Sequence, residues 1–255
     1  RLVSFFRAQL QQRFFQALRL MLIHNLWNNL LPMRAGEISF PILMKRYFSI
    51  PASDSLPALF WFRLLDLYLV LMLAVISLLL IQDQPLLAVL LMTLLTLAIP
   101  LAYLLLPKLL SSLERYAPEK LARILAQCRL ALPSSWRLLL LSSFWTLLNW
   151  TVKLAAFGWI IMQFVEIDEG LALLGAIGGE LTTVLPIHGV AGAGTYEAGV
   201  VAALLPSGVD KQQALIAAVN LHLFLLSCTL LSGLLSFFIP GRSRPEETGT
   251  THEPR

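Results

Sequence analysis

The chain has 255 residues, of which 57% are apolar and only 13% are charged. Charged residues make up about a quarter of a typical soluble domain, so this composition excludes a disordered chain and argues against a water-soluble globule. The apolar residues come in long runs rather than alternating with polar residues. Such runs predict an all-α fold, a polytopic membrane helix bundle.

The charges and cysteines exclude several classes of function. The net charge of +4 comes from 19 basic and 15 acidic residues, and the basic residues cluster at the edges of the apolar runs. Nucleic acid is therefore not expected as a partner. Cys128 and Cys228 lie far apart in the sequence, so neither a disulfide framework nor a metal site is predicted. We expect no cofactor.

The chain begins with Arg1 rather than with a methionine. Arg1, Arg7, Arg13 and Arg19 interrupt the apolar residues too often for the core of a signal peptide. We therefore expect that upstream residues are missing.

The first apolar stretch is too short to cross a membrane. Only 14 uncharged residues separate Arg19 from Arg34, and they include a histidine and three asparagines; after Glu37 the next charge is already Lys45. A spanning helix needs about 20 predominantly apolar residues. This stretch therefore predicts a re-entrant hairpin, which dips into the membrane and returns to the same side.

The next two apolar runs are long enough to span. The run from Pro57 to Ile81 carries Arg63 and Asp66 in its first third. The run from Pro85 to Pro107 has 23 residues without a charge, enough to cross about 30 Å of hydrocarbon.

A basic loop and a third span are predicted next. Residues 108–137 contain six basic residues against two acidic ones, Glu114 and Glu119. From Leu138 to Val165 the only charged residue is Lys153, so we expect this run to cross.

A second hairpin precedes the last span. The stretch from Gly170 to Ile187 contains Glu180 and ends in a Leu-Pro pair, after which three glycines lead into a limb that holds Glu197 and ends near Pro206. Neither limb is long and apolar enough to cross alone. A re-entrant hairpin is again predicted, with glycines that let the chain turn tightly inside the bundle.

The fourth span is predicted from Gln212 to Ile239, with His222 as its only ionisable group. The Pro-Gly pair that follows is a suitable helix stop. Residues 241–255 are predicted to be a disordered polar tail.

The distribution of charge predicts the orientation of the chain. Five arginines and no acidic residue precede Glu37, whereas Asp83 and the acidic residues at 166–169 lie at the other ends of the spans. Short loops rich in Lys and Arg mark the cytoplasmic side. We therefore expect both termini in the cytoplasm of a bacterial-type inner (plasma) membrane, and hairpins that enter from opposite faces.

The two hairpin regions resemble each other. Asn29 to Glu37 and Thr183 to Glu197 each contain a Leu-Pro pair, a basic side chain two residues past the proline and a downstream glutamate. Two copies in opposite orientation form an inverted-topology repeat, which places a substrate site near the midplane. Residues 1–107 are then repeat one, 108–137 the cytoplasmic loop and 138–240 repeat two.

These two segments resemble the signature regions of the flippase-like family that includes the transmembrane region of lysylphosphatidylglycerol synthase. The resemblance extends from about Asn25 to Ile239. It implies an integral inner-membrane protein that moves lipids between leaflets, without the soluble aminoacyl-transferase domain found in the best-known member. The family usually has additional N-terminal helices, and many members have a small polar residue where this chain has His188.

Several ionisable or polar residues fall inside the predicted spans and hairpins. A charge at a helix centre costs about 2.5 to 3.5 kcal/mol on insertion scales, so these groups are expected to pair or to line a polar cavity. The predicted substrate-binding or pathway residues are Arg34, Glu37, Arg63, Asp66, Lys153, Glu180, His188, Tyr196, Glu197 and His222.

The two hairpins contain the strongest candidates. Arg34 beside a helix N-terminus could hold a phosphodiester, with His188 in a weaker matching role, or Arg34 could snorkel or pair with Glu37. Glu37 and Glu197 could cap their helices, or form a proton or cationic-headgroup site. Glu180 could accept hydrogen bonds from a nearby threonine.

The spans contribute further candidates. Arg63 and Asp66 share a helix face, which permits a salt bridge. Lys153 could neutralise Glu180 or Glu197, or contact an anionic headgroup. His222 is either a satisfied core histidine or part of the pathway.

No catalytic motif is present, and we expect no catalytic residues and no enzyme activity. The first hypothesis is a flippase-like transporter of an anionic or aminoacylated phospholipid, driven by the lipid gradient or by protons through Glu37 or Glu197. The second is a membrane-embedded lipid-modifying enzyme that uses Glu37, Glu197 and His188 as acid–base groups. The third is a scaffold for a lipid synthase. Homo-oligomerisation stays open.

Overall fold

The computed structural model describes residues 1–130, 132–184 and 189–241, and every regular element in these ranges is a helix. The all-α prediction is therefore confirmed for the described part of the chain. His188 and the second Leu-Pro pair lie outside the described residues, as does the predicted tail beyond Gly241.

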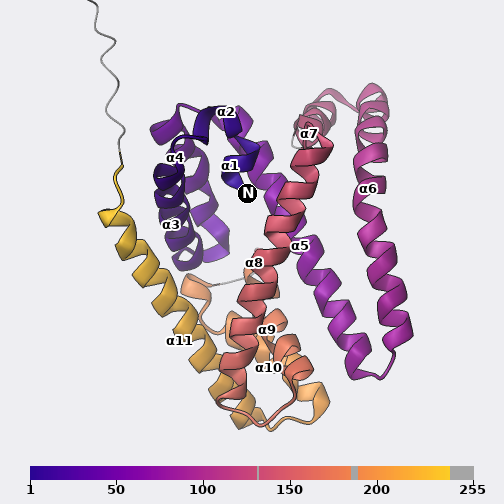
Figure 1. Ribbon diagram of the computed structural model, residues 1–255, viewed down its shortest axis with the longest axis vertical. Helices are drawn as coiled ribbons and strands as arrows, with labels where there is room; N and C mark the ends of the chain where they lie inside the picture. Colours follow the sequence, from indigo (N-terminus) through magenta and orange to yellow (C-terminus); the bar gives the residue numbers. More distant parts are fainter. Residues whose placement is uncertain (131, 185–188, 242–255) are drawn as a thin grey trace, which may run out of the picture.

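The helices follow one another with short connections (Figure 1). In chain order they are α1 (Leu2–Phe5), α2 (Arg7–Leu10), α3 (Phe14–Leu30), η1 (Pro32–Ile38), α4 (Ser39–Phe48), α5 (Ala52–Ile81), α6 (Pro85–Tyr116), α7 (Glu119–Leu130), α8 (Trp136–Met162), α9 (Glu169–Val184), η2 (Val190–Gly192), α10 (Thr195–Leu204), η3 (Leu205–Ser207), α11 (Lys211–Leu235) and η4 (Ser236–Phe238).

Four described helical segments are long and apolar enough to cross a membrane, and they coincide with the four predicted spans. They are Ala52–Ile81, Pro85–Tyr116, Trp136–Met162 and Lys211–Phe238. The first begins before Pro57 because its polar opening turn is also helical, with Asp54 at the positive end of the helix dipole. The chain is thus a multi-pass membrane protein.

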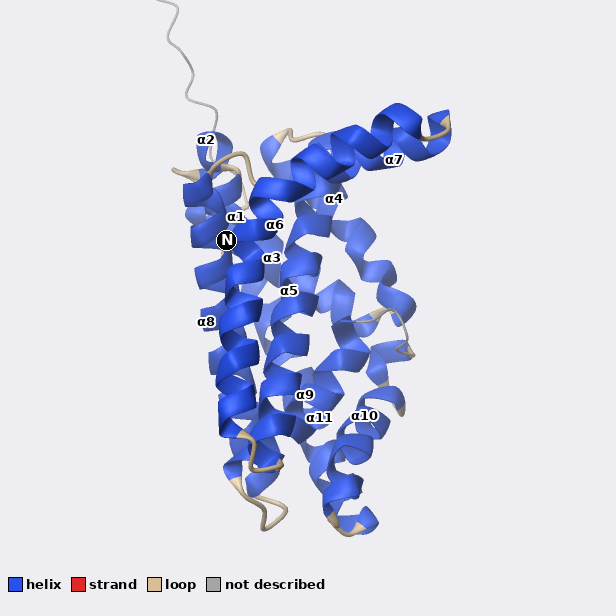
Figure 2. Ribbon diagram, turned by 90° about the vertical axis from the view of Figure 1, so that its right-hand side faces the viewer, coloured by secondary structure: helices blue, strands red, loops and turns tan. Residues whose placement is uncertain are grey.

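Residues 108–137, predicted as a loop between spans, are largely helical. Helix α6 continues through Pro107 to Tyr116, and α7 follows directly. Arg129 of α7 forms an ion pair with Glu114 of α6, with 2.9 Å between Nε and Oε1. Figure 2 shows α7 lying across the end of the bundle. The basic segment therefore folds back over α6 rather than extending away from it.

Two helical hairpins lie at opposite ends of the molecule. The pair α3–α4 lies at the end that holds α7, and the pair α9–α10 lies at the other end (Figures 1 and 2). Their turns face each other, since η1 and α3 both contact η2. Each hairpin therefore brings a break in its helices toward the middle of the bundle.

Each hairpin has its own apolar core. One core cluster joins α1 to α5, with Phe40 and Leu20 among its fully buried side chains. The other joins α5, α8, α9, α10 and α11, with Ile177 and Leu221 at its centre. Helix α5 contributes to both, so it links the two hairpin regions.

Helices α9 and α10 pack unusually closely. A Cβ atom added at Gly199 would lie 2.4 Å from the carbonyl oxygen of Gly178, and the reverse substitution meets the oxygen of Gly199 at the same distance. Small residues that allow backbones to approach are a common device of membrane helix packing. This contact fixes the second hairpin.

Replacing Gly199 by Ala should destabilise the protein, because the methyl group collides with backbone that cannot move aside. Overpacking of this kind costs about 1 to 3 kcal/mol, and we expect a lower midpoint of thermal unfolding in detergent. Gly158→Ala is the matched control, since the added Cβ atom would lie 3.6 Å from the nearest backbone atoms of α9, an ordinary contact. Equal midpoints for the two variants would contradict this account of the hairpin.

Candidate functional site

The turn of the first hairpin holds a charged cluster that reaches across to α5. The carboxylate of Glu37 lies 3.1 Å from Nε of Arg34 and 2.8 Å from Nε of Arg63. Arg34 has a left-handed backbone, with φ of 57°, which non-glycine residues adopt at a cost and which is found often at functional sites. Two guanidinium groups thus share one carboxylate.

Arg34 also joins the two hairpins. Its Nη1 atom donates a 2.6 Å hydrogen bond to the carbonyl oxygen of Val184, the last residue of α9. Carbonyl groups at a helix C-terminus have no partner within the helix, and a cation there is favourable. The arginine of one turn therefore closes the helix end of the other hairpin.

Asp66 is the most enclosed carboxylate of this region, with a side chain only 5% exposed. It forms ion pairs with Arg1 at 2.7 Å and with Arg63 at 3.4 Å, and it accepts a 3.0 Å hydrogen bond from the indole nitrogen of Trp150. The predicted salt bridge between Arg63 and Asp66 is confirmed. The carboxylate also ties α5 to α8 through Trp150.

A second ion pair lies between α8 and α9. Nζ of Lys153 lies 2.6 Å from Oε2 of Glu180, whose side chain is only 1% exposed. The hydroxyl of Thr183 donates to the same oxygen at 3.2 Å, as predicted. Of the two carboxylates considered for Lys153, the structure selects Glu180.

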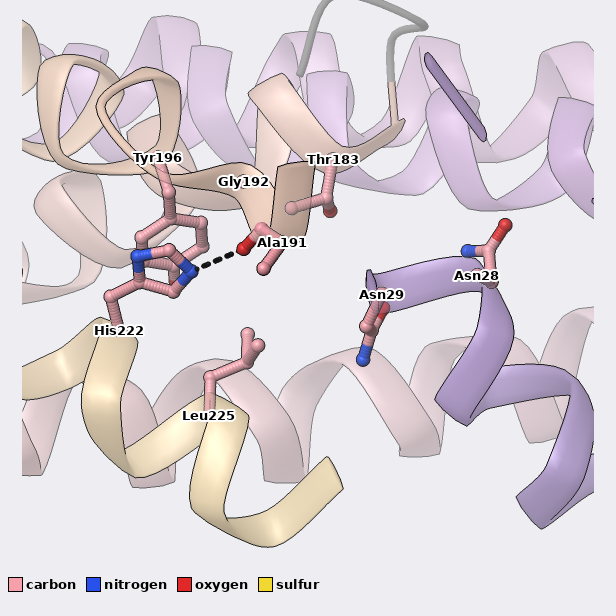
Figure 3. A pocket seen from close by; sticks show the side chains of 8 residues that line it. All are labelled: Asn28, Asn29, Thr183, Ala191, Gly192, Tyr196, His222 and Leu225. Carbon is pink, nitrogen blue, oxygen red and sulfur yellow. Dashed lines mark hydrogen bonds between the residues drawn. The ribbon is translucent and has the colours of Figure 1, made fainter. Parts of the chain in front are cut away.

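A third group lies in the second hairpin and on α11. Nδ1 of His222 is 2.7 Å from Oε1 of Glu197, and Nε2 of His222 is 2.8 Å from the carbonyl oxygen of Ala191. The ring of Tyr196 stacks on the imidazole, with 4.7 Å between the ring centroids. Figure 3 shows the stacked rings and the bond to Ala191.

A cavity of about 710 Å³ brings half of the ten predicted residues together. Five of them line it: Arg34, Arg63, Asp66, Lys153 and Glu180. The rest of its wall is largely apolar. Phe14 of α3, Trp145 of α8 and Phe224 of α11 belong to the lining and have exposed side chains, so the cavity is accessible where these aromatic side chains lie.

A smaller chamber adjoins the cavity and is lined by two further predicted residues. Its lining includes Tyr196 and His222, and it shares Asn28, Asn29, Thr183 and Leu225 with the cavity. In Figure 3 the two asparagines face His222 and Tyr196 across this space. The chamber lies where the two hairpin turns meet, since its wall contains residues of both α3 and η2.

The charges that meet around the cavity do not cancel. Among the residues that the structure describes, these ion pairs contain four cationic side chains, those of Arg1, Arg34, Arg63 and Lys153, but only three carboxylates, those of Glu37, Asp66 and Glu180. Within this described set one positive charge is in excess. An anionic group in the cavity would balance it.

The structure also decides between the roles considered for individual residues. The side chain of Arg34 is only 12% exposed, so it does not snorkel to the surface, and it pairs with Glu37 as one alternative predicted. Helix α4 has no side-chain cap, so Glu37 is not its cap. Glu197 does cap its helix, with Oε2 accepting from the backbone nitrogen of Gly194 at 2.8 Å.

Sequence reasoning missed several residues of the site. His24 is buried and contacts Ser39 and Arg63, at 3.0 Å and 3.4 Å. Asn29 donates to Thr229 of α11 at 2.9 Å. The available signal was the group of asparagines and a histidine in a short apolar stretch, which the prediction used only to exclude a span. His188, predicted to have a weaker role that matches that of Arg34 in the second hairpin, lies outside the described residues.

The described residues contain no group of three or more His, Cys, Asp or Glu side chains that could hold a metal ion. The polar groups of the site are instead ion pairs and hydrogen bonds between side chains. Their arrangement suits the binding of a charged group rather than metal coordination.

Comparison with known proteins gives one result. The model of the family described as the lysylphosphatidylglycerol synthase TM region matches residues 5–233, nearly the whole described chain. No curated protein and no solved structure matches the chain.

Removing one partner of the pair between α8 and α9 should show what the pair contributes. Lys153→Met leaves the buried carboxylate of Glu180 without a cation, which typically costs about 3 to 5 kcal/mol. Adding Glu180→Gln should restore most of the stability, because no buried charge then remains unpaired. Thermal unfolding of the two single variants and the double variant measures this coupling. Additive effects would contradict a direct ion pair.

Proposed function

The chain belongs to the family of the lysylphosphatidylglycerol synthase TM region, and from this premise we propose that it moves anionic phospholipids between the leaflets of the membrane. A lipid-related membrane function follows from the family. The movement of lipid through this chain is the proposal, and the cavity is what supports it.

The single observation that carries the proposal is the combination of a charged interior with an accessible, largely apolar wall. The interior has guanidinium groups from Arg34 and Arg63 beside Lys153, which suit the oxygens of a phosphodiester. The lining also includes aromatic side chains that are exposed, Phe14, Trp145 and Phe224. A headgroup can occupy such a cavity while its acyl chains stay in the bilayer.

The proposal includes the inverted arrangement of the two hairpins. Each is too short to cross, each has a turn near the middle of the bundle, and the two lie at opposite ends (Figure 1). In an inverted-topology repeat the broken helices place the site near the midplane. The left-handed residues in both turns, Arg34 in one and Ala191 in the other, fit this role for the breaks.

The orientation of the chain is part of the same proposal. The basic segments at α2, α4 and α7 lie at one end of the molecule, and the acidic turns at Asp83 and 166–169 lie at the other (Figure 2). We place the basic end in the cytoplasm of an inner membrane.

The enzyme alternative has less support from the geometry. Its acid–base groups were Glu37, Glu197 and His188. Glu37 is held by two guanidinium groups and Glu197 by an imidazole, and neither belongs to the lining of the cavity. The transport proposal requires no catalytic group.

Arg34→Gln should slow the transbilayer movement of a headgroup-labelled phosphatidylglycerol in proteoliposomes. The substitution removes the positive charge that would bind the phosphodiester. A hydrogen bond to a charged group is worth about 1.5 to 3 kcal/mol, so its loss should slow lipid movement roughly tenfold or more. Movement is read from the fraction of labelled lipid accessible to a membrane-impermeant quencher over time.

Glu119→Gln is the matched control, since Glu119 forms an exposed ion pair with Arg123 on α7, away from the cavity. It should move lipid at the wild-type rate. Wild-type movement by a folded Arg34→Gln protein would overturn the role of the charged interior.

The orientation can be tested with the native cysteines. Cys128 lies on α7 and Cys228 on α11, so a Cys228→Ser variant retains a single thiol at the basic end. We expect a membrane-impermeant maleimide to label it only in inside-out vesicles. Asp83→Cys in the same background should add labelling from the outside. Labelling of Cys128 from the outside would reverse the proposed orientation.

A further inference from the structure

We infer that the pair formed by His222 and Glu197 binds a proton that is taken up and released as lipid moves, so that transport is proton-coupled. This inference rests on the proposed function. It concerns the group formed by Glu197, His222 and Tyr196, which lies beside the cavity and not in its lining. It also distinguishes between Glu37 and Glu197 as the proton-carrying carboxylate.

The hydrogen bonds of His222 fix the number of protons on the pair. The carbonyl oxygen of Ala191 can only accept, so the Nε2 atom that lies 2.8 Å from it must carry hydrogen. The other ring nitrogen lies 2.7 Å from Oε1 of Glu197, and this contact needs a proton as well. The pair as observed therefore holds one proton more than a neutral imidazole and a free carboxylate.

The extra proton can be bound by either member of the pair. It can sit on Nδ1 of His222, which gives an imidazolium beside a carboxylate, or on Glu197, which then donates to the ring. The backbone nitrogen of Gly194 donates to the second oxygen of Glu197 at 2.8 Å, which favours the carboxylate. Without the extra proton the neutral ring could donate from only one nitrogen, so lone pairs would face each other either toward Glu197 at 2.7 Å or toward Ala191 at 2.8 Å.

Glu37 lacks this property. Its two ion-pair partners are the guanidinium groups of Arg34 and Arg63, which do not lose their protons in proteins. Neither partner of Glu37 can therefore pass a proton to it. His222 and Glu197, by contrast, form a pair in which both members have an atom at the contact that can bind the proton.

The groups around the pair leave it free to change charge. From α9, Glu180 lies beyond Tyr196, whose ring packs against Gly179 and stacks on His222, and the charge of Glu180 is already matched by Lys153 of α8. From α3, the side chains that face His222 are the uncharged Asn28 and Asn29. Arg34 of η1 is directed to the carbonyl of Val184.

The small chamber provides contact between the pair and the cavity. Its volume of about 10 Å³ is close to what one water molecule needs, and its wall includes the polar groups of Asn28, Asn29 and Thr183. One water in this position would place a proton carrier between the cavity and His222. The chamber therefore gives the pair a route to the lipid site.

Release of the proton would also loosen the meeting point of the hairpins. His222 of α11 holds η2 through the carbonyl of Ala191 and holds α10 through Glu197, and η2 contacts α3 and η1 of the first hairpin. Once the extra proton leaves, the neutral ring can donate from only one nitrogen, so one of these two hydrogen bonds is lost. The contact between the two turns is then held from α11 by one bond instead of two.

Glu197→Gln removes the exchangeable proton of the pair but keeps its hydrogen bonds. The amide nitrogen of Gln donates to Nδ1 of His222, Nε2 still donates to Ala191, and the amide oxygen still accepts from Gly194. Every hydrogen bond is kept, so we expect this variant to fold with an unchanged midpoint of thermal unfolding. It is equivalent to a pair that never releases its proton.

The first measurement is ¹⁵N NMR of the imidazole nitrogens in nanodiscs, with His222→Gln used to assign the signal. We expect both ring nitrogens of the wild-type protein to share in hydrogen-bonded protons, whereas in Glu197→Gln only Nε2 carries hydrogen. The same titration of His222 in both proteins would overturn the inference, whether or not lipid moves.

The second measurement is lipid movement in phosphatidylglycerol-containing proteoliposomes between pH 5.5 and 8.5, with and without an imposed pH gradient. Binding of a single proton can change the wild-type rate by up to about tenfold per pH unit. We expect Glu197→Gln to lose both the movement and its dependence on the gradient, and Glu119→Gln to retain both.

The two measurements distinguish the possible failures. A shared proton seen by NMR with wild-type lipid movement that ignores pH and gradient would make the pair structural and overturn the coupling. A wild-type protein that moves none of the labelled lipids would overturn the proposed function and the coupling together. NMR would in that case still decide whether the pair holds the proton.

Discussion

The structure depends on one constraint: an ionised side chain inside an apolar bundle needs a partner, and the partners lie on other helices. A charge at the centre of a bilayer costs about 2.5 to 3.5 kcal/mol on insertion scales. Glu37 meets this need through Arg63 of α5, and Glu180 meets it through Lys153 of α8. Because each pair joins two elements, the charges determine how the hairpins and the spans are positioned against one another.

The helix breaks follow from the same requirement. A helix that ends inside the bundle exposes carbonyl groups that have no partner in the helix and no water to replace it. At the end of α9 the guanidinium of Arg34 supplies the missing donor to Val184. In η2 the imidazole of His222 does the same for Ala191. Basic side chains thus make the two breaks possible, and the breaks in turn bring those side chains to the cavity.

Features that depend on residues close together in the sequence could be predicted, whereas contacts between distant residues could not. Spans depend on the length of an apolar run, so all four were predicted, and the salt bridge between Arg63 and Asp66 followed from their spacing on one helix. The bonds from Trp150 to Asp66 and from Arg34 to Val184 connect residues 84 and 150 positions apart. No local pattern encodes such pairs, because they exist only once the helices have packed.

The arginines of the cavity and the pair of His222 and Glu197 differ in whether they can exchange a proton. A proton-coupled lipid transporter, as proposed here, needs one site that binds the headgroup and another that binds the proton. Arg34 and Arg63 cannot give up their protons in proteins, and a phosphodiester also keeps its charge, so the proposed lipid site would stay attractive to an anionic headgroup. The pair of His222 and Glu197 instead shares a proton between two groups that can each bind it. Because His222 lines the small chamber and not the cavity, the proposed proton site would act on the contact between the hairpin turns without taking part in binding the headgroup. A histidine in place of Arg34 would have to bind both the headgroup and the proton, and it would lose its attraction for the headgroup whenever it released the proton.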